Sequence, residues 1–198
     1  MSAIFLSASV PLPERDPRYI DTADVIAIRD AVRALAAVVL PSLELHWGGH
    51  PSITPLIRSV AEDVGLLGST RVHLYQSEYF AGQFPVENDD FQAVVLTSRR
   101  ESREASLEEM RRVMLSAVNF DAGVFIGGME GVEDEFRLFR AFNPDALALP
   151  IASTGAAARI LYDRYRGELT LPEALLREYT YASLFRDHVP SIGGAELG

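Results

Sequence analysis

The sequence predicts an α/β protein of the Rossmann-like, doubly wound class, in which a mainly parallel sheet carries helices on both faces. Short apolar segments alternate along the chain with longer segments whose apolar residues recur at helical spacing. The apolar segments are nearly continuous, as expected for strands that are buried on both faces. Clusters of glycine, serine and threonine follow these segments and do not precede them. In a parallel sheet such clusters gather at the carboxyl edge, where ligands bind.

Six apolar segments have the length and composition of buried strands. They are residues 3–6, 43–47, 72–75, 93–96, 123–126 and 147–149. The connection between the third and fourth strands is polar and irregular, whereas each of the other connections contains a helical segment. This alternation of strand and helix is typical of parallel sheets.

The helical segments have recognisable starts. The first begins near Thr22 and carries an apolar stripe. Ser52 is expected to be the N-cap of the second, and Pro55 falls in its first turn, where proline is tolerated. Ser106 and Glu109 have the spacing of a capping box for the third. Further helices are predicted over residues 132–142, from 155 to about 166, and after 171, ahead of a glycine-containing tail.

Length, charge and composition limit the class of protein. A chain of 198 residues, nearly half of them apolar, predicts a single domain over residues 1–198 with one well-buried core. A net charge of −10 disfavours a long nucleic acid as partner, because such ligands are bound by neutralising many phosphates. The absence of cysteine excludes disulfides and thiolate nucleophiles. The start of the chain does not have the pattern of a signal peptide, and no segment is apolar enough to span a membrane, so we expect a cytoplasmic protein without a membrane partner.

The segment FIGGMEGVEDEF, residues 125–136, predicts a binding loop. Gly127 and Gly128 follow the fifth strand, where glycine lets the backbone and the neighbouring Met129 approach a ligand closely. Gly131 opens the next helix, whose N–H groups point outward. These residues are expected to bind an anionic group.

Glu135 is the most informative acid of this segment. It lies three residues after Val132 and four before Phe139, so it shares a helix face with apolar side chains. A carboxylate there is costly to bury unless it is paired or used. A site role is therefore one interpretation of Glu135, and a supporting hydrogen bond is the other. The neighbouring acids are expected to be solvated and favoured by the helix dipole: Glu130, Glu133 and Asp134.

Three further loops repeat the arrangement of a strand followed by small residues. The residues that they are expected to contribute to binding are Ser7, Ser9, Gly48, Gly49, His50, Ser52, Thr154 and Gly155. Hydroxyl groups and helix starts suit phosphate or ribose. For His50 and Ser52 a purely structural role is the alternative. Four such turns after four strands indicate one shared pocket far better than a single glycine pair does.

A basic cluster lies in this otherwise acidic chain. Arg99, Arg100 and Arg103 precede the third long helix, and Arg111 and Arg112 flank its apolar stripe. Arginine suits phosphate because its planar fork donates two hydrogen bonds at once. We expect at least one of the five to contact the ligand, with a solvated surface as the alternative for the others.

Taken together, these segments resemble the SLOG superfamily, the Rossmann-like group that includes the LOG ("Lonely Guy") phosphoribohydrolases and the DprA/Smf proteins. The resemblance covers Phe5 to about Arg159 and rests on four segments: FLSASVP, GGHPSITPLI, SLEEMRRVML and GGMEGVEDEF. LOG enzymes carry a PGGxGTxxE signature after an arginine-bearing helix. The positions that match the signature are Gly127, Gly128, Gly131 and Glu135, and Arg111 or Arg112 occupies the place of the catalytic arginine. Ile126 and Val132 replace its proline and threonine, and one extra residue precedes Gly131.

The resemblance implies a nucleotide or a nucleotide-derived phosphorylated ligand. Two functions follow from it: a domain that senses or processes such a ligand, or an enzyme that cleaves the N-glycosidic bond of a nucleotide. Glu135 and an arginine of the 107–118 helix would act as catalytic residues in the second. LOG-like proteins are commonly homodimers, so a homodimer is expected by analogy.

Other functions have less support. An NAD(P) oxidoreductase is disfavoured because the loop after the first strand, SASVPLPERD, lacks the GxGxxG pattern. A purely structural interaction protein would leave the aligned glycine loops unexplained. No metal site and no cofactor are predicted, because the four histidines show no ligand spacing with nearby acids: His46, His50, His73 and His188.

Overall fold

The computed structural model describes residues 2–190, so the predicted glycine-containing tail lies outside the described residues. The strands are β1 (Ala3–Ser9), β2 (Glu44–Trp47), β3 (Val72–Ser77), β4 (Ala93–Thr97), β5 (Ala122–Gly127) and β6 (Leu147–Ile151). They form one sheet in the order β4-β3-β2-β1-β5-β6, and all neighbouring strands are parallel. The prediction of a doubly wound α/β fold is confirmed.

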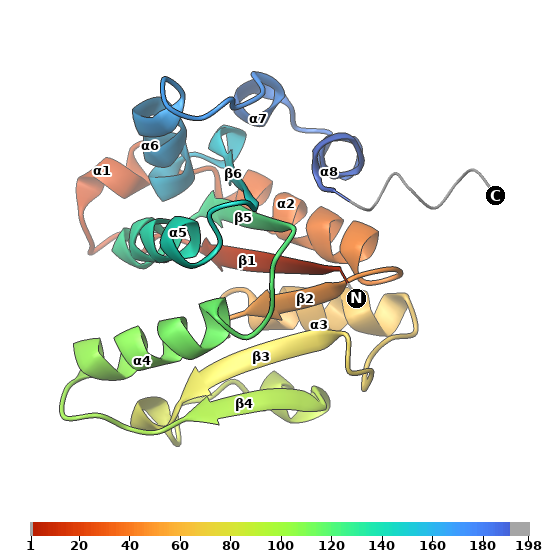
Figure 1. Cartoon of the computed structure of the whole chain (residues 1–198), viewed down its shortest axis with the longest axis vertical. Helices are drawn as coiled ribbons and strands as arrows, with labels where there is room; N and C mark the ends of the chain where they lie inside the picture. The colour runs from red at the N-terminus through yellow and green to blue at the C-terminus, as the bar shows by residue number, and fades with distance from the viewer. Residues whose placement is uncertain (1, 191–198) are drawn as a thin grey trace.

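Helices cover both faces of this sheet (Figure 1). The helices are α1 (Pro17–Ile20), α2 (Val25–Val39), α3 (Thr54–Asp63), α4 (Arg103–Leu115), α5 (Glu130–Phe142), α6 (Ala156–Tyr165), α7 (Ala174–Arg177) and α8 (Tyr181–His188). Short 3₁₀ turns are η1 (Glu78–Phe80), η2 (Val86–Asp90) and η3 (Ala152–Thr154). One hydrophobic cluster joins the sheet to α2, α3 and α8, and a second joins it to α1, α4, α5 and α6. No helix within residues 2–190 is long and apolar enough to cross a membrane.

Successive side chains of β1 point to opposite faces of the sheet, so this strand contributes to both hydrophobic clusters. Ile4 and Leu6 enter the cluster under α2, whereas Phe5 enters the cluster under α5. The Phe5 ring stacks on Phe139 of α5, with ring centroids 5.5 Å apart. Burial of such rings on this face of the sheet fixes α5, and with it the start of α5, against the sheet.

The topology opens a crevice at the carboxyl edge between β1 and β5. From β1 the chain builds β2, β3 and β4 on one side and then returns to add β5 and β6 on the other. The connections on either side of β1 therefore leave the sheet in opposite directions, which opens a crevice at this switch point. Ser7, Ala8 and Ser9 of β1 lie beside residues 125–127 of β5 there.

The predicted start of α4 is wrong. The helix begins at Arg103, and its N-cap is Ser102, whose hydroxyl accepts a hydrogen bond from Ala105 N at 3.0 Å. Ser106 is instead buried and donates to Ser102 O at 2.7 Å, while Glu109 pairs with Arg100 at 2.7 Å. Two serines four residues apart compete for the capping position, and packing of Ser106 against the sheet decides between them.

The predicted cap at Ser52 is also wrong. Residue 53 occupies the N-cap position of α3, and no side chain caps this helix. The Ser52 hydroxyl bonds His50 Nδ1 at 2.8 Å and accepts a hydrogen bond from Val10 N at 3.3 Å. Ser52 therefore ties the loop after β2 to the loop after β1.

Candidate functional site

A cavity of about 570 Å³ opens at the carboxyl edge of the sheet, over the switch point. The carboxyl ends of β1, β2 and β3, one face of α4, the start of α5 and the segment 80–85 form its wall. The predicted binding residues on this wall are Ser7, Ser9, Gly48, Gly49, His50, Arg103, Arg111, Met129, Gly131 and Glu135. Three of the four predicted turns, those after β1, β2 and β5, thus converge on one space, whereas the turn after β6 does not reach it.

Glu135 faces this cavity and is held by two neighbours. Its Oε2 accepts a 2.6 Å hydrogen bond from Ser7 Oγ of β1, and its Oε1 accepts a 3.3 Å bond from Arg111 Nε of α4. The side chains of Glu135 and Arg111 are only 15% and 14% exposed. The pairing offsets the cost of burying a carboxylate, and it fixes the carboxylate in one orientation on the wall.

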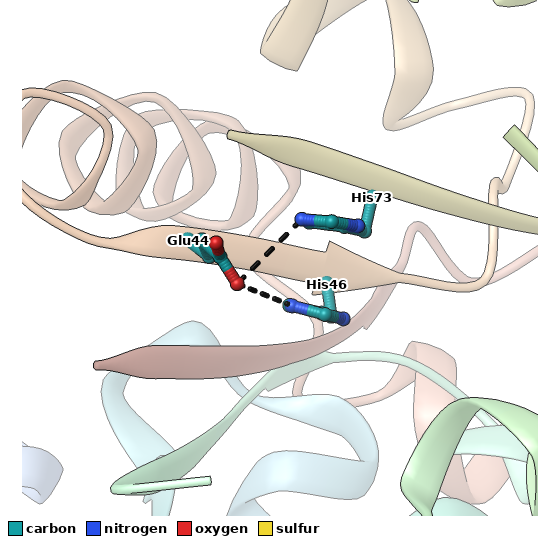
Figure 2. A group of neighbouring side chains, drawn as sticks. All are labelled: Glu44, His46 and His73. Carbon is teal, nitrogen blue, oxygen red and sulfur yellow. Dashed lines mark ion pairs between the residues drawn. The ribbon is translucent and has the colours of Figure 1, made fainter. Parts of the chain in front are cut away.

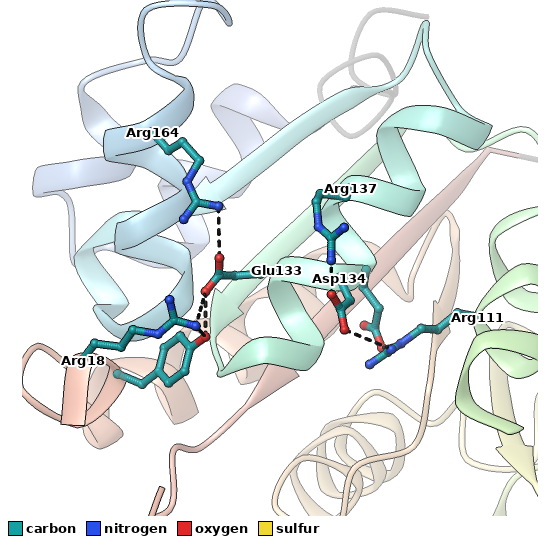
Figure 3. Close-up of polar contacts among 8 residues, drawn as sticks. Arg18, Arg111, Glu133, Asp134, Arg137 and Arg164 are labelled. Carbon is teal, nitrogen blue, oxygen red and sulfur yellow. Dashed lines mark hydrogen bonds and ion pairs between the residues drawn. The ribbon is translucent and has the colours of Figure 1, made fainter. Parts of the chain in front are cut away.

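Arg111 is the arginine of α4 that joins this site. Besides Glu135 it contacts Asp134, with Nη1 3.4 Å from Oδ2, so it bridges α4 and α5 (Figure 3). Arg112 points the other way: it is 58% exposed and pairs with Glu108 at 3.5 Å one turn earlier. Of the two arginines that the sequence left open, only Arg111 lies on the cavity wall.

The start of α5 presents unpaired backbone donors to the cavity. Within the described part of the chain, the N–H groups of Met129, Glu130 and Gly131 donate no hydrogen bond, and no side chain caps the helix. All three residues line the cavity. Such N–H groups, together with the helix dipole, favour an anion.

Two arginines add positive charge to the same wall. Arg15, in the loop after β1, and Arg103, at the start of α4, both line the cavity and are exposed. Neither guanidinium has an acidic partner among the residues that the structure describes. Most other arginines of this chain are paired, so two unpaired ones on one wall indicate an anionic ligand. Arg15 was not predicted, because nothing in the sequence marks this loop as adjacent to α4.

Much of the remaining cavity lining is apolar. Trp47 of β2, Leu12 and Met110 contribute to it, together with Phe80 and Phe84 of the polar, irregular segment that follows β3. The sequence shows no pattern in that segment, and its position depends on the pairing of β3 with β4. A cavity lined both by apolar and aromatic side chains and by cationic ones suits a ligand with an aromatic ring and a phosphate.

The loop after β2 is fixed by side-chain hydrogen bonds. Gln76 of β3 donates to Gly49 O at 3.0 Å, which holds the glycine backbone against the cavity. Burial lowers the pKa of His50, so its imidazole is neutral at neutral pH. His50 therefore offers a hydrogen bond and not a positive charge.

Several predicted binding residues do not lie on the cavity wall: Ser52, Arg99, Arg112, Gly127, Gly128, Thr154 and Gly155. Arg99 and Arg112 are exposed, whereas the contacts of the glycines and Thr154 are internal. Gly127 N donates to Thr154 Oγ1 at 2.9 Å, and Gly128 N donates to Ser9 O at 2.8 Å. Gly128 has φ +85°, and a Cβ there would lie 2.2 Å from Val132, so this glycine is needed for the turn into α5. Arg99 lies over the ring of Tyr79.

The prediction that Glu133 is solvated is wrong. This carboxylate is 9% exposed and accepts a 2.7 Å hydrogen bond from Tyr19 Oη. Arg164 of α6 and Arg18 of α1 lie 3.1 and 3.3 Å from its oxygens (Figure 3). Burial raises the pKa of Tyr19, and the hydrogen bond to Glu133 raises it further. The phenol therefore stays protonated and donates its hydrogen bond to Glu133. Partners 31 or more residues away in sequence bury this acid, which no local pattern indicates.

Glu133→Gln is expected to lower the free energy of unfolding by about 1–3 kcal/mol, because two arginines and a buried phenol lose their charged acceptor. The urea unfolding midpoint, followed by circular dichroism, measures this. Glu173→Gln is the control: that acid is 68% exposed and pairs with Arg177 one turn away, so a change below about 0.5 kcal/mol is expected. Equal stabilities of the two variants would contradict a structural role for Glu133.

The sequence predicted no cluster of histidines and acids, but the folded chain contains one. Glu44, His46 and His73 bring their ligating atoms within 4.8 Å of one another. The interpretation that these histidines lack acidic neighbours is therefore wrong, because it considered spacing along one strand and not pairing between β2 and β3.

The fold, with a crevice at its switch point, defines a Rossmann-like α/β protein. Residues 18–189 match the model of the SLOG cluster3 family, so the chain belongs to this family. The resemblance that the glycine loops and helix segments indicated is thereby confirmed. No curated protein matches the chain.

A solved structure confirms the fold independently. The X-ray structure of TM1055, a Northeast Structural Genomics Consortium target, matches with a TM-score of 0.56. The match covers 82% of this chain and 81% of TM1055, at 16% sequence identity. At this identity the likeness concerns the fold alone.

Proposed function

We propose that this protein binds a nucleotide or a nucleotide-derived phosphorylated ligand in the cavity at the switch point, as a sensor or processing domain. The observation that carries the proposal is the unpaired guanidinium groups of Arg15 and Arg103, which line the same cavity as the uncapped start of α5. Membership of the SLOG cluster3 family supports it. The homodimer and the cytoplasmic location expected from the sequence stay predictions.

The residues that line the cavity suggest how such a ligand is oriented in it. The phosphate accepts hydrogen bonds from the N–H groups of Glu130 and Gly131 and from the two arginines. The base packs on the apolar wall that includes Trp47. The sugar then lies between these two regions, next to Glu135.

A thermal-shift panel tests this proposal with AMP, ADP, cyclic AMP and ADP-ribose as probes. Adenosine, which lacks the phosphate, is the matched control. Trp47 is the single tryptophan of the chain and lies on the cavity wall, so its fluorescence reports binding at this site independently. Stabilisation by a phosphorylated probe but not by adenosine supports the proposal. No stabilisation by any probe, with no change in fluorescence, would overturn it.

The second candidate function is hydrolysis of a nucleotide N-glycosidic bond. The observation that favours it is the fixed carboxylate of Glu135 on the cavity wall, held by Ser7 and Arg111. In this reaction the bond between the base and the sugar C1′ breaks and water adds to C1′. Glu135 would stabilise the positive charge that develops on the ribose, or accept the proton of the water.

Glu135→Gln separates binding from hydrolysis. Glutamine keeps the shape of the side chain and can accept the hydrogen bond from Ser7, so binding of AMP is expected within a few-fold of the wild type. Release of adenine from AMP, measured by chromatography, is expected to fall at least about 100-fold. Base release that persists in the variant would exclude Glu135 as the catalytic residue. Wild-type protein that binds AMP but releases no adenine would support ligand binding without hydrolysis.

A further inference from the structure

Three side chains that commonly bind metals meet outside the cavity (Figure 2). Glu44 and His46 lie two residues apart on β2 and therefore on the same face of the sheet. His73 of β3 is the register partner of His46. Glu44 Oε2 lies 3.5 Å from His46 Nε2 and 3.6 Å from His73 Nε2. All three ligating atoms thus surround one point between the two strands.

Both imidazoles place an unsatisfied nitrogen beside this carboxylate. The Nε2 atoms of His46 and His73 are buried and have no hydrogen-bond partner among the described residues. His46 is only 1% exposed. Buried polar atoms in native proteins are nearly always satisfied, so two unsatisfied nitrogens next to one carboxylate indicate a missing partner.

The chemistry around His46 suits a metal ligand. Burial, and next the proximity of His73, lowers the pKa of His46 to about 3, so its imidazole is neutral and its contact with Glu44 is not an ion pair at neutral pH. Its Nδ1 lies 3.0 Å from Tyr75 Oη. Metal-binding histidines typically use the second nitrogen in such a contact, which fixes the orientation of the ring.

We propose that Glu44, His46 and His73 bind a divalent transition metal ion, with zinc as the expected metal. In a tetrahedral zinc site the ligating atoms are about 3.4 Å apart, close to the two distances from Glu44. The two imidazole rings are stacked with centroids 4.1 Å apart, so each ring turns about χ2 to direct its nitrogen at a shared ion. Glu44 and His73 are partly exposed, which leaves room for water as the fourth ligand.

This site is distinct from the cavity, because none of its three residues lines the cavity wall. It bridges β2 and β3 on the face of the sheet that also carries Tyr75 and Phe120. Two imidazoles and one carboxylate select zinc and related metals over magnesium, which prefers an all-oxygen environment. An ion bound here would join the two strands, and it would stabilise the native state.

Metal titration of the full chain, without an affinity tag and after treatment with a chelator, tests this proposal. Calorimetry is expected to show one zinc ion per chain, and zinc at 100 times its Kd is expected to raise the melting temperature by about 5–10 °C. Magnesium is expected to have no effect. Cobalt is expected to give the visible absorption of a four-coordinate ion and to quench the fluorescence of the adjacent Trp47.

Substitutions of the proposed ligands test where the zinc ion binds. His73→Gln and Glu44→Gln change partly exposed residues and are each expected to weaken zinc binding at least about tenfold. His188→Gln, in α8, is the control and is expected to bind zinc as the wild type does. Melting temperatures without metal establish that each variant folds. Wild-type protein that does not bind zinc, unchanged binding in His73→Gln, or an equal loss in His188→Gln would overturn the proposal.

Discussion

Gly155→Ala is expected to lower the free energy of unfolding by about 4 kcal/mol or more, the largest stability effect that this structure predicts. Gly155 has φ +72° and ψ −158°, a conformation that is essentially restricted to glycine. A Cβ there would lie 1.7 Å from the backbone oxygen of Thr22. That backbone cannot move aside freely, because Thr22 Oγ1 accepts a hydrogen bond from Ala156 N at 2.9 Å.

Urea unfolding of Gly155→Ala against Gly167→Ala measures this effect. Gly167 is the matched control, because it does not have a positive φ and a Cβ there has no neighbour within 4 Å. The control is expected to change stability by less than about 0.5 kcal/mol or to increase it slightly. A Gly155→Ala variant as stable as the wild type would refute the structural role that we assign to this glycine.

Removal of both unpaired arginines, in Arg15→Ala/Arg103→Ala, is expected to weaken binding of AMP or ADP-ribose about 100-fold or more. Each charge-assisted hydrogen bond to a phosphate contributes about 1.5–3 kcal/mol, or about 10- to 100-fold in affinity. Both side chains are exposed, so the stability of the unliganded protein is expected to stay within about 0.5 kcal/mol. Calorimetry at fixed ionic strength measures the affinity.

The control is Arg99→Ala/Arg112→Ala, which removes the same charge from the same region of the protein. Neither residue lines the cavity. Long-range electrostatics alone is expected to change binding only a few-fold in this variant at physiological salt. Equal losses in the two double variants would show that net charge, and not contact with the phosphate, determines affinity.

The strands were predictable from sequence because both faces of the sheet are covered, and buried strands consist of nearly continuous apolar residues. The predicted ends were short at the carboxyl side. β1 extends through Ser7 and Ser9, since β5 supplies hydrogen-bond partners for these polar residues. The residues that belong to the site are the ones that interrupt the apolar pattern.

Glu133 and Glu135 show where local patterns fail. Periodicity placed Glu135 on the apolar face of α5, and the structure places it on the cavity wall. The same reasoning left Glu133 in solvent, because its partners Tyr19 and Arg164 come from distant elements. Glu44 and His46 share β2, but the cluster with His73 was missed, because only the register of β2 and β3 brings His73 beside them.

We expect the start of α5 to bind the phosphate, and the stabilisation of Gly131→Leu by a ligand measures this. Gly131 lies on the cavity wall within α5, and the nearest atom to a Cβ there is Arg111 Nη2 at 3.1 Å, the end of a flexible side chain. Leucine is therefore expected to fold as well as glycine, or slightly better, while it blocks the phosphate position.

A phosphorylated probe at 100 times its Kd is expected to raise the melting temperature of the wild type by about 5–10 °C. No such rise is expected for Gly131→Leu, whose melting temperature without ligand should match that of the wild type. If the probe stabilised the variant as much as the wild type, the start of α5 would not be the phosphate site.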